Sequence, residues 1–148
     1  MTERPLIAIT QGDPCGIGPE VVARALGGGR PYAVARPVVI GCVESMEAGV
    51  AVAGVDLKVR RISSLDGVGM DPGRLDVLDE GRLDPGRIQP GRAVAECGRA
   101  NGAWLATAAE LCTRGDAAGT VMAPVNAEAL VRGAQRGRSS APTRPPGI

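Results

Sequence analysis

The feature that most constrains the fold lies near the N-terminus, where a strand, a glycine-rich turn and a helix follow one another without a break. Residues 6–10 read Leu-Ile-Ala-Ile-Thr, a short apolar run rich in β-branched side chains. Such a run is typical of a strand that is buried on both faces of a parallel sheet. The run ends at a loop dense in Gly and Pro. Pro19 and Glu20 then favour the first turn of a helix, because proline suits that turn and an acidic side chain suits the positive end of the helix dipole. This opening predicts an α/β protein.

The rest of the chain continues the alternation of strands and helices. Short apolar runs at 38–41, 57–62 and 119–122 predict further strands. Helices are expected at about 43–53, at 91–114, where apolar residues recur at three- and four-residue steps, and from Asn126 as a cap. Residues 63–90 are dense in Gly, Pro and Asp and are predicted to form loops with small strands. The order of these elements indicates an α/β fold.

Composition fits one soluble domain with an unusual core. The chain has 148 residues, of which 44% are hydrophobic and 22% are charged. Phe is absent, and Tyr32 and Trp104 are the only aromatic residues. Because small aliphatic side chains bury less area than aromatic ones, we expect extensive contact between sheet and helices, or a partner surface. Trp104 is expected in the core or at a dimer surface.

Charge and targeting signals exclude several classes of function. The net charge of +1 gives no global attraction to nucleic acid or acidic lipid. No stretch has the apolar length of a membrane span, and the N-terminus lacks the features of a signal peptide, so a cytoplasmic location is expected. The chain contains no histidine, and its four cysteines show no C-x-x-C spacing. We therefore predict no zinc site and four reduced, mostly buried thiols: Cys15, Cys42, Cys97 and Cys112.

The loop at 12–18 is the most informative candidate site. A glycine-dense turn that leads into a helix exposes backbone N–H groups beside the positive end of the helix dipole, which suits an anion. The loop fits neither common phosphate-binding pattern, because Gly16-x-Gly18 lacks the third glycine of the dinucleotide fingerprint and no Gly-Lys-Ser/Thr follows. From the residues alone, a phosphate-binding loop and a tight turn without a ligand both stay open.

The C-terminal residues differ in kind from the rest. Residues 133–148 are rich in Arg, Pro, Ser and Gly, with no periodicity and no acidic residue, and are predicted to be disordered. We divide the chain into 1–132, one folded part, and 133–148, a tail. The abrupt change suggests a frameshift or premature ending soon after Val131; a natural extension is the alternative. A nucleic-acid-binding arm is disfavoured, because aromatic residues and a folded basic surface are lacking.

Three blocks resemble the 4-hydroxythreonine-4-phosphate dehydrogenase family, in the same order as in that family. Residues 7–20 read Ile-Ala-Ile-Thr-Gln-Gly-Asp-Pro-Cys-Gly-Ile-Gly-Pro-Glu and are similar to its opening. Residues 38–41, Val-Val-Ile-Gly, resemble its second strand. Residues 119–130 read Gly-Thr-Val-Met-Ala-Pro-Val-Asn-Ala-Glu-Ala-Leu and resemble its strand, turn and helix before the active-site histidine motif.

The resemblance implies an α/β fold like that of isocitrate and isopropylmalate dehydrogenases, with only its N-terminal part present here. It implies a homodimer that oxidises a phosphorylated hydroxy-amino acid with NAD, on the route to pyridoxal phosphate. A divalent metal cation held by histidines stabilises the developing alkoxide. By this resemblance the cofactor-binding candidates are Gly12, Asp13, Gly16 and Gly18, and the substrate-binding candidate is Asn126. The alternatives are that Asp13 bonds its own backbone and that Asn126 only caps its helix.

The sequence departs from the family at the positions that carry chemistry. In the family the helix after residue 130 leads into Gly-His-Thr-Glu, whereas this chain has no histidine at all. Ala127 stands where the family usually has lysine. We therefore expect no catalytic or metal-binding residue in this chain and no activity from it alone. The alternative is a non-catalytic or split-subunit role, in which the chain pairs with a separate C-terminal half or only binds phosphate.

Overall fold

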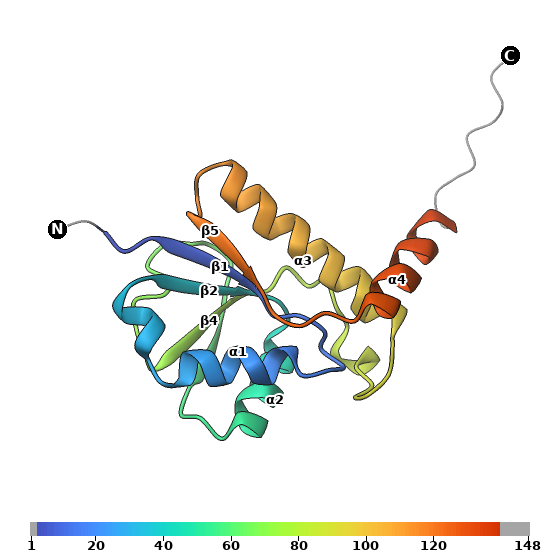
Figure 1. Cartoon of the computed structure of the whole chain (residues 1–148), viewed down its shortest axis with the longest axis horizontal. Coiled ribbons are helices and arrows are strands. Elements are labelled where there is room, and N and C mark those ends of the chain that lie inside the picture. Colours follow the sequence, from blue (N-terminus) through green and yellow to red (C-terminus); the bar gives the residue numbers. More distant parts are fainter. Residues whose placement is uncertain (1–2, 140–148) are drawn as a thin grey trace, which may run out of the picture.

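The computed structural model describes residues 3–139 as a parallel sheet with helices on both faces (Figure 1). The sheet has five strands in the order β3-β4-β2-β1-β5, and every pairing is parallel. The predicted α/β fold is confirmed. The strands are β1 (Leu6–Thr10), β2 (Arg36–Ile40), β3 (Lys58–Ile62), β4 (Arg74–Leu78) and β5 (Gly119–Met122). The helices are α1 (Gly18–Gly27), α2 (Val43–Ala53), α3 (Ala95–Thr113) and α4 (Ala127–Ser139), with short 3-10 turns at Arg30–Ala33 and Pro85–Arg87.

Two apolar cores lie on the two faces of the sheet. Helices α1 and α2 cover one face, where Val22, Leu26 and Met46 pack on β2 and β4. Helix α3 covers the other face, where Trp104 packs with the alternate β1 residues Leu6 and Ala8. Trp104 is only 1% exposed, which places it in the core. Residues 37–40 of β2 are buried on both faces, as the continuous apolar run there predicts.

Most boundaries lie close to the predicted ones, and helix α3 starts later than predicted. Helix α3 begins at Ala95, after a turn in which the Arg92 N–H donates to the Gln89 carbonyl (3.1 Å). Strand β4 lies in the segment predicted as loops with small strands, and it sits inside the sheet between β2 and β3. Its position there gives it partners on both sides, which short-range pattern alone does not reveal.

Helix α4 corrects the predicted start of the disordered tail. The helix continues through residues 133–139, so the boundary after residue 132 falls inside it. Its support is tertiary: a Cβ on Gly98 of α3 would lie 1.8 Å from the Ala129 carbonyl oxygen, and one on Gly133 would lie 2.5 Å from the Arg99 nitrogen. Two glycines thus let α3 and α4 cross in close backbone contact. The remaining part of the predicted tail, 140–148, lies outside the described residues.

The cysteine side chains and the lengths of the helices give two further observations. All four cysteines are free; Cys15, Cys42 and Cys97 are buried and Cys112 is half-buried. Within the described part of the chain, no helix has the length and apolar character needed to cross a membrane.

Candidate functional site

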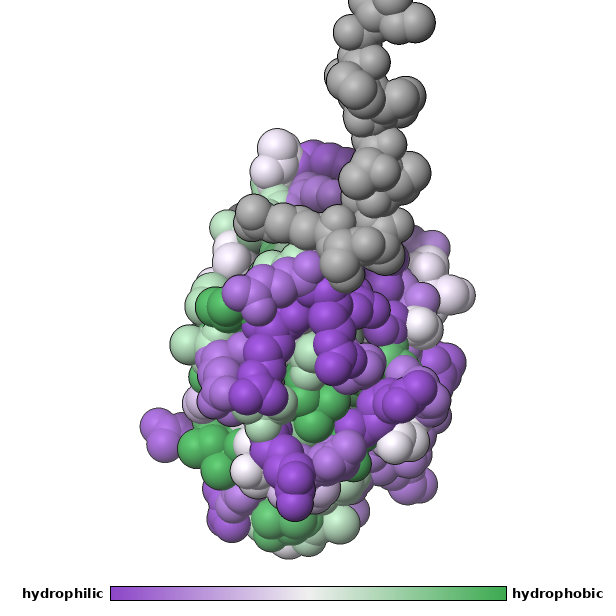
Figure 2. Space-filling model, turned by 90° about the vertical axis from the view of Figure 1, so that its right-hand side faces the viewer, coloured by the Kyte–Doolittle hydropathy of each residue, from purple (hydrophilic) through white to green (hydrophobic). Residues whose placement is uncertain are grey.

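The candidate residues gather at the carboxyl edge of the sheet, where ligands bind in open parallel sheets. The loop 11–17 follows β1, and the turn 123–126 follows β5. The Asp13 N–H donates to the Pro124 carbonyl (2.9 Å), so the two segments lie side by side. Figure 2 faces this edge and shows a surface dominated by hydrophilic side chains, with smaller apolar areas between them.

The loop after β1 satisfies much of its own hydrogen bonding. The Cys15 N–H donates to Asp13 Oδ1 (3.0 Å), and the Gly16 N–H donates to the Asp13 carbonyl (3.1 Å). Together with the bonds from Asp13 to the Pro124 carbonyl and from Gln11 to the Ile40 carbonyl, four of the loop's N–H groups have acceptors within the protein. Asp13 is 7% exposed and bonds its own loop, which is the alternative role weighed from the sequence.

The loop glycines allow close backbone packing. Gly12 has a φ of +78°, and a Cβ there would lie 2.3 Å from the Pro124 carbonyl oxygen. A Cβ on Gly18 would lie 2.4 Å from the Gln11 carbonyl oxygen. Gly16 is less restricted, because its Cβ would meet only the Asp13 carboxylate, at 3.2 Å. Gly12 and Gly18 are therefore required by the fold itself, whether or not a ligand binds.

Asn126 caps helix α4. Its Oδ1 accepts a hydrogen bond from the Ala129 N–H (3.0 Å), the usual contact of an N-cap side chain. The predicted cap is confirmed. The side chain is half-buried at the same edge as Asp13.

Gln11 is a key residue that sequence reasoning missed. It is fully buried, its Oε1 accepts from the Cys42 N–H (2.7 Å), and its Nε2 donates to Ser45 Oγ (3.0 Å). Gly41 makes room for it, since a Cβ there would lie 2.1 Å from Gln11 Oε1. Gln11 thus ties the end of β1 to the turn that starts α2. A polar side chain directly after a buried strand was the only signal in the sequence.

Two buried thiols hold the loop against helix α3. The Cys15 and Cys97 sulfur atoms lie 3.4 Å apart, and the Gln89 N–H donates to Cys15 Sγ (3.3 Å). Burial raises the pKa of the Cys97 thiol strongly. A protonated thiol is a poor nucleophile and a poor metal ligand, so Cys97 acts in packing.

The part of the chain that the structure describes brings together one group of three metal-ligating side chains. Cys42, Glu44 and Asp79 have ligand atoms within 4.8 Å of one another. Arg61 already occupies this position, with Nη1 2.7 Å from Asp79 Oδ2 and Nη2 3.2 Å from Glu44 Oε1. Asp79 Oδ2 also accepts from the Val43 N–H (3.0 Å), and burial raises the pKa of Cys42 to about 11. These residues do not fit a divalent cation.

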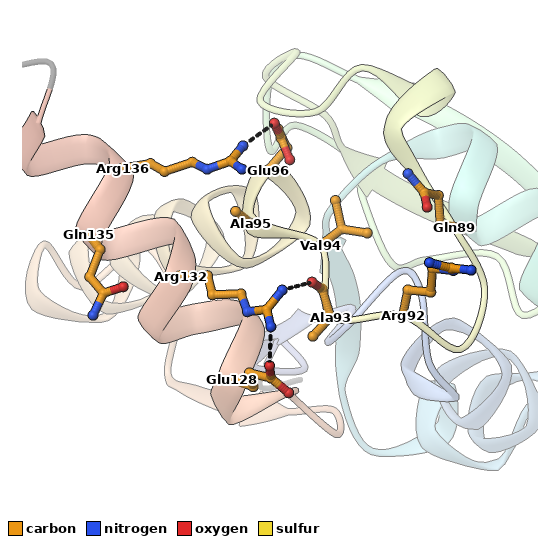
Figure 3. A pocket seen from close by; sticks show the side chains of 10 residues that line it. All are labelled: Gln89, Arg92, Ala93, Val94, Ala95, Glu96, Glu128, Arg132, Gln135 and Arg136. Atoms are coloured by element: carbon orange, nitrogen blue, oxygen red, sulfur yellow. Dashed lines mark hydrogen bonds and ion pairs between the residues drawn. The ribbon is translucent and has the colours of Figure 1, made fainter.

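A polar cavity of about 820 Å³ lies between the start of α3 and helix α4 (Figure 3). Arg132 reaches across it to the Ala93 carbonyl (3.4 Å) and pairs with Glu128. Arg136 pairs with Glu96 (3.0 Å). The pKa of Glu96 is lowered, first by a hydrogen bond from its own backbone N–H and then by Arg136 and neighbouring arginines. The chain thus supplies its own anion at this helix start.

A smaller, mainly apolar cavity of about 420 Å³ lies beside the loop, between α1, α2 and residues 85–90. Cys15 and Gly16 line it, whereas Asp13 and Asn126 do not. The structure therefore brings the predicted site residues to one edge but does not gather them around one cavity.

Known proteins with similar sequence and structure cover most of this chain. A model of the family described as pyridoxal phosphate biosynthetic protein PdxA matches residues 33–137. The 4-hydroxythreonine-4-phosphate dehydrogenase of Desulfosudis oleivorans is 36% identical over 130 residues, covering 88% of this chain and 38% of that protein. The D-threonate 4-phosphate dehydrogenase of Pectobacterium atrosepticum is 35% identical over 128 residues, covering 84% and 38%.

A solved structure confirms the fold. The crystal structure of a 4-hydroxythreonine-4-phosphate dehydrogenase from Burkholderia phymatum superposes with a TM-score of 0.83 at 34% identity, over 89% of this chain and 40% of that one. The resemblance stated from the sequence is confirmed. The chain spans about two fifths of the length of these relatives.

Proposed function

Because the chain belongs to the pyridoxal phosphate biosynthetic protein PdxA family, we propose that it is the N-terminal part of an NAD-dependent dehydrogenase for a phosphorylated hydroxy acid. The observation that carries this proposal is the 36% identity over 130 residues to a 4-hydroxythreonine-4-phosphate dehydrogenase. A second relative is named for D-threonate 4-phosphate. Both names specify a phosphorylated alcohol, so this is the substrate class we assign, with 4-phosphohydroxy-L-threonine as the first candidate. A cytoplasmic location and a homodimeric assembly are parts of the same proposal.

In this proposal the residues of this chain position the cofactor and the substrate, and none of them is a catalytic residue. We propose that Gly12, Asp13, Gly16 and Gly18 lie beside the nicotinamide cofactor and that Asn126 lies beside the substrate. Support comes from their common position at the carboxyl edge and from the bond between Asp13 and the turn before Asn126. In this proposal Gln11 is a positioning residue, because its buried amide fixes the turn next to the loop.

The same proposal includes inactivity of the isolated chain. The family reaction, as the resemblance implies it, uses a divalent cation held by histidines, and this chain contains none. The group formed by Cys42, Glu44 and Asp79 does not substitute for them, because Arg61 holds both carboxylates.

The test is NAD reduction by the purified 148-residue chain with 4-phosphohydroxy-L-threonine and a divalent cation, followed by absorbance. The full-length Desulfosudis oleivorans relative, assayed under the same conditions, is the positive control. The expected result is turnover by the relative and none by the chain. Turnover by the pure chain would show that the proposed inactivity is wrong.

A second candidate function is a split subunit, in which the chain pairs with a polypeptide that carries the rest of the fold. The observation that favours it over phosphate binding alone is the state of the loop after β1. Its Asp13, Cys15 and Gly16 N–H groups already have acceptors within the protein. These three N–H groups are therefore not available to a free phosphate.

A further inference from the structure

Two cysteines that are distant in the sequence bring their sulfur atoms together beside the candidate site. Cys15 lies in the loop after β1, and Cys97 lies in the first turn of α3, 82 residues further along the chain. Their Sγ atoms are 3.4 Å apart, and both thiols are free. The sulfur atoms of a disulfide lie about 2.05 Å apart, so the reduced pair is already in the contact from which such a bond forms.

The turn before α3 holds Cys15 in this position. The Gln89 N–H donates to Cys15 Sγ (3.3 Å), and the Gly91 N–H donates to the Cys15 carbonyl (2.8 Å). From the loop itself, Asp13 Oδ1 accepts from the Cys15 N–H (3.0 Å). The backbone and the sulfur of Cys15 are thus fixed by separate hydrogen bonds, which keep Sγ next to Cys97. Holding two groups in contact in this way accelerates the reaction between them.

The two thiols differ in their access to a small molecule. Cys15 lines the cavity of about 420 Å³ beside the loop, together with Pro14, Gly16 and Pro90. Cys97 does not line it and is fully buried. Burial also raises the pKa of Cys97, so this thiol stays protonated at neutral pH. A small oxidant in the cavity therefore meets Cys15 first, and Cys97 is placed to react second.

We propose that Cys15 and Cys97 are an oxidation site, at which hydrogen peroxide converts the two thiols into a reversible disulfide. In the first step the Cys15 sulfur attacks one peroxide oxygen and the O–O bond breaks. Cys15 becomes a sulfenic acid, and the departing hydroxide takes the Cys15 thiol proton and leaves as water.

In the second step the Cys97 sulfur attacks the Cys15 sulfur and the S–O bond breaks. The hydroxide that leaves takes the Cys97 thiol proton and becomes a second water. Over both steps the two thiols lose two electrons, and the peroxide gains them. A dithiol restores the reduced pair by thiol–disulfide exchange. The inference does not rest on the proposed function, because it uses only contacts within this chain.

The other two cysteines provide controls within the same molecule. The Cys42 thiol donates to Glu44 Oε2 (3.2 Å) rather than to a second sulfur. Cys112 is half-buried near the end of α3. The rise of an α-helix places it roughly 22 Å from Cys97 along the helix axis. Neither is expected to form a disulfide within the folded chain.

The test is treatment of the folded 148-residue chain with hydrogen peroxide, followed by blocking of free thiols and mass spectrometry of a digest made without reductant. Cleavage after Arg24, Arg92 and Arg99 places each of the four cysteines on a peptide of its own. The expected main product joins the Cys15 and Cys97 peptides and disappears after treatment with dithiothreitol. Oxidation without this link, or links formed equally among all four cysteines, would overturn the proposal.

Variants separate the two steps. In Cys97→Ser the second step is blocked, so labelling of Cys15 by dimedone, which traps sulfenic acids, is expected to rise at least about tenfold over the wild type. Cys112→Ser is the matched control on the same helix and is expected to form the link as the wild type does. Equal dimedone labelling of Cys15 in wild type and Cys97→Ser would show that Cys97 does not resolve the sulfenic acid.

Hydrogen exchange measures what the link does to the loop. The disulfide joins residues 11–17 covalently to α3, so openings that separate the loop from the helix are no longer possible. The amides of Asp13, Cys15 and Gly16 are therefore expected to exchange more slowly in the oxidised chain than in the reduced one, while those of β3 stay unchanged. Equal exchange of the loop amides in both forms would contradict the restraint of the loop by oxidation.

Discussion

The loop after β1 and the strand β5 lie at neighbouring positions, yet they differ in how far this chain completes them. In the loop, Asp13, Cys15 and Gly16 find hydrogen-bond acceptors within the protein, and Gly12 packs directly on a carbonyl oxygen. In β5, one side pairs with β1 and the other has no strand among residues 3–139. The glycine-rich loop thus forms hydrogen bonds within the protein, whereas β5 has one side without a paired strand among residues 3–139. The loop after β1 carries the family resemblance, yet the unpaired backbone groups lie on β5.

The largest effect on stability is expected from a substitution in the loop after β1. Gly12→Ala places a methyl group 2.3 Å from the Pro124 carbonyl oxygen and forces a positive φ on a residue with a side chain. We expect the free energy of unfolding to fall by about 3 kcal/mol, from overpacking and backbone strain together. Denaturant unfolding measures it.

Gly28→Ala is the matched control, because a Cβ there meets no atom within 4 Å and its φ is −80°. Its stability is expected to change by less than about 0.5 kcal/mol. Val121→Lys on the open edge is expected to stay within the same range, because the side chain is already exposed. If Gly12→Ala changed the free energy of unfolding as little as these two variants, Gly12 would not pack against the Pro124 carbonyl oxygen as the structure describes.

A smaller effect is expected when the link between β1 and α2 is removed. Gln11→Leu leaves the buried Cys42 N–H without its acceptor, which is expected to lower the free energy of unfolding by about 2 kcal/mol. Gln135→Leu, at an exposed position on α4, is the control and should change it little. Equal stability of the two variants would show that the Gln11 contacts contribute nothing net.

A further effect appears only at alkaline pH. Burial raises the pKa of Cys42 from 9.0 to about 11, so the folded state favours the neutral thiol more than the unfolded state does. This contribution to stability is complete below pH 9 and is lost progressively as the pH rises from 9 through 11. Unfolding of wild type and Cys42→Ala across this range measures it. A variant that loses stability as steeply as the wild type would exclude Cys42 as the cause.

The pattern of neighbouring residues in the sequence predicted those strands, helices and caps that depend on only a few consecutive residues. The strand, loop and helix from Leu6 to Gly27 and the cap at Asn126 depend on neighbours in the sequence, and the structure has them as expected. The parallel α/β fold followed from the alternation of such elements. The resemblance then placed them in a family.

Contacts between distant residues could not be predicted in this way. The extension of α4 beyond residue 132 depends on Gly98 and Gly133, which allow two helices to cross in close contact. The roles of Gln11 and Arg61 depend on partners in other elements of the fold. The openness of β5 depends on strand order, which no single strand reveals.

NAD reduction by an equimolar mixture of this chain and the remaining segment of the Desulfosudis oleivorans relative tests the central claim most directly. The chain supplies the loop after β1, and the added segment supplies the part of the family fold that this chain does not span. We predict no reduction with the chain alone or the segment alone, and measurable reduction of NAD with 4-phosphohydroxy-L-threonine once the two are combined. Reduction by the chain alone, or a complex that forms and stays inactive, would contradict the account.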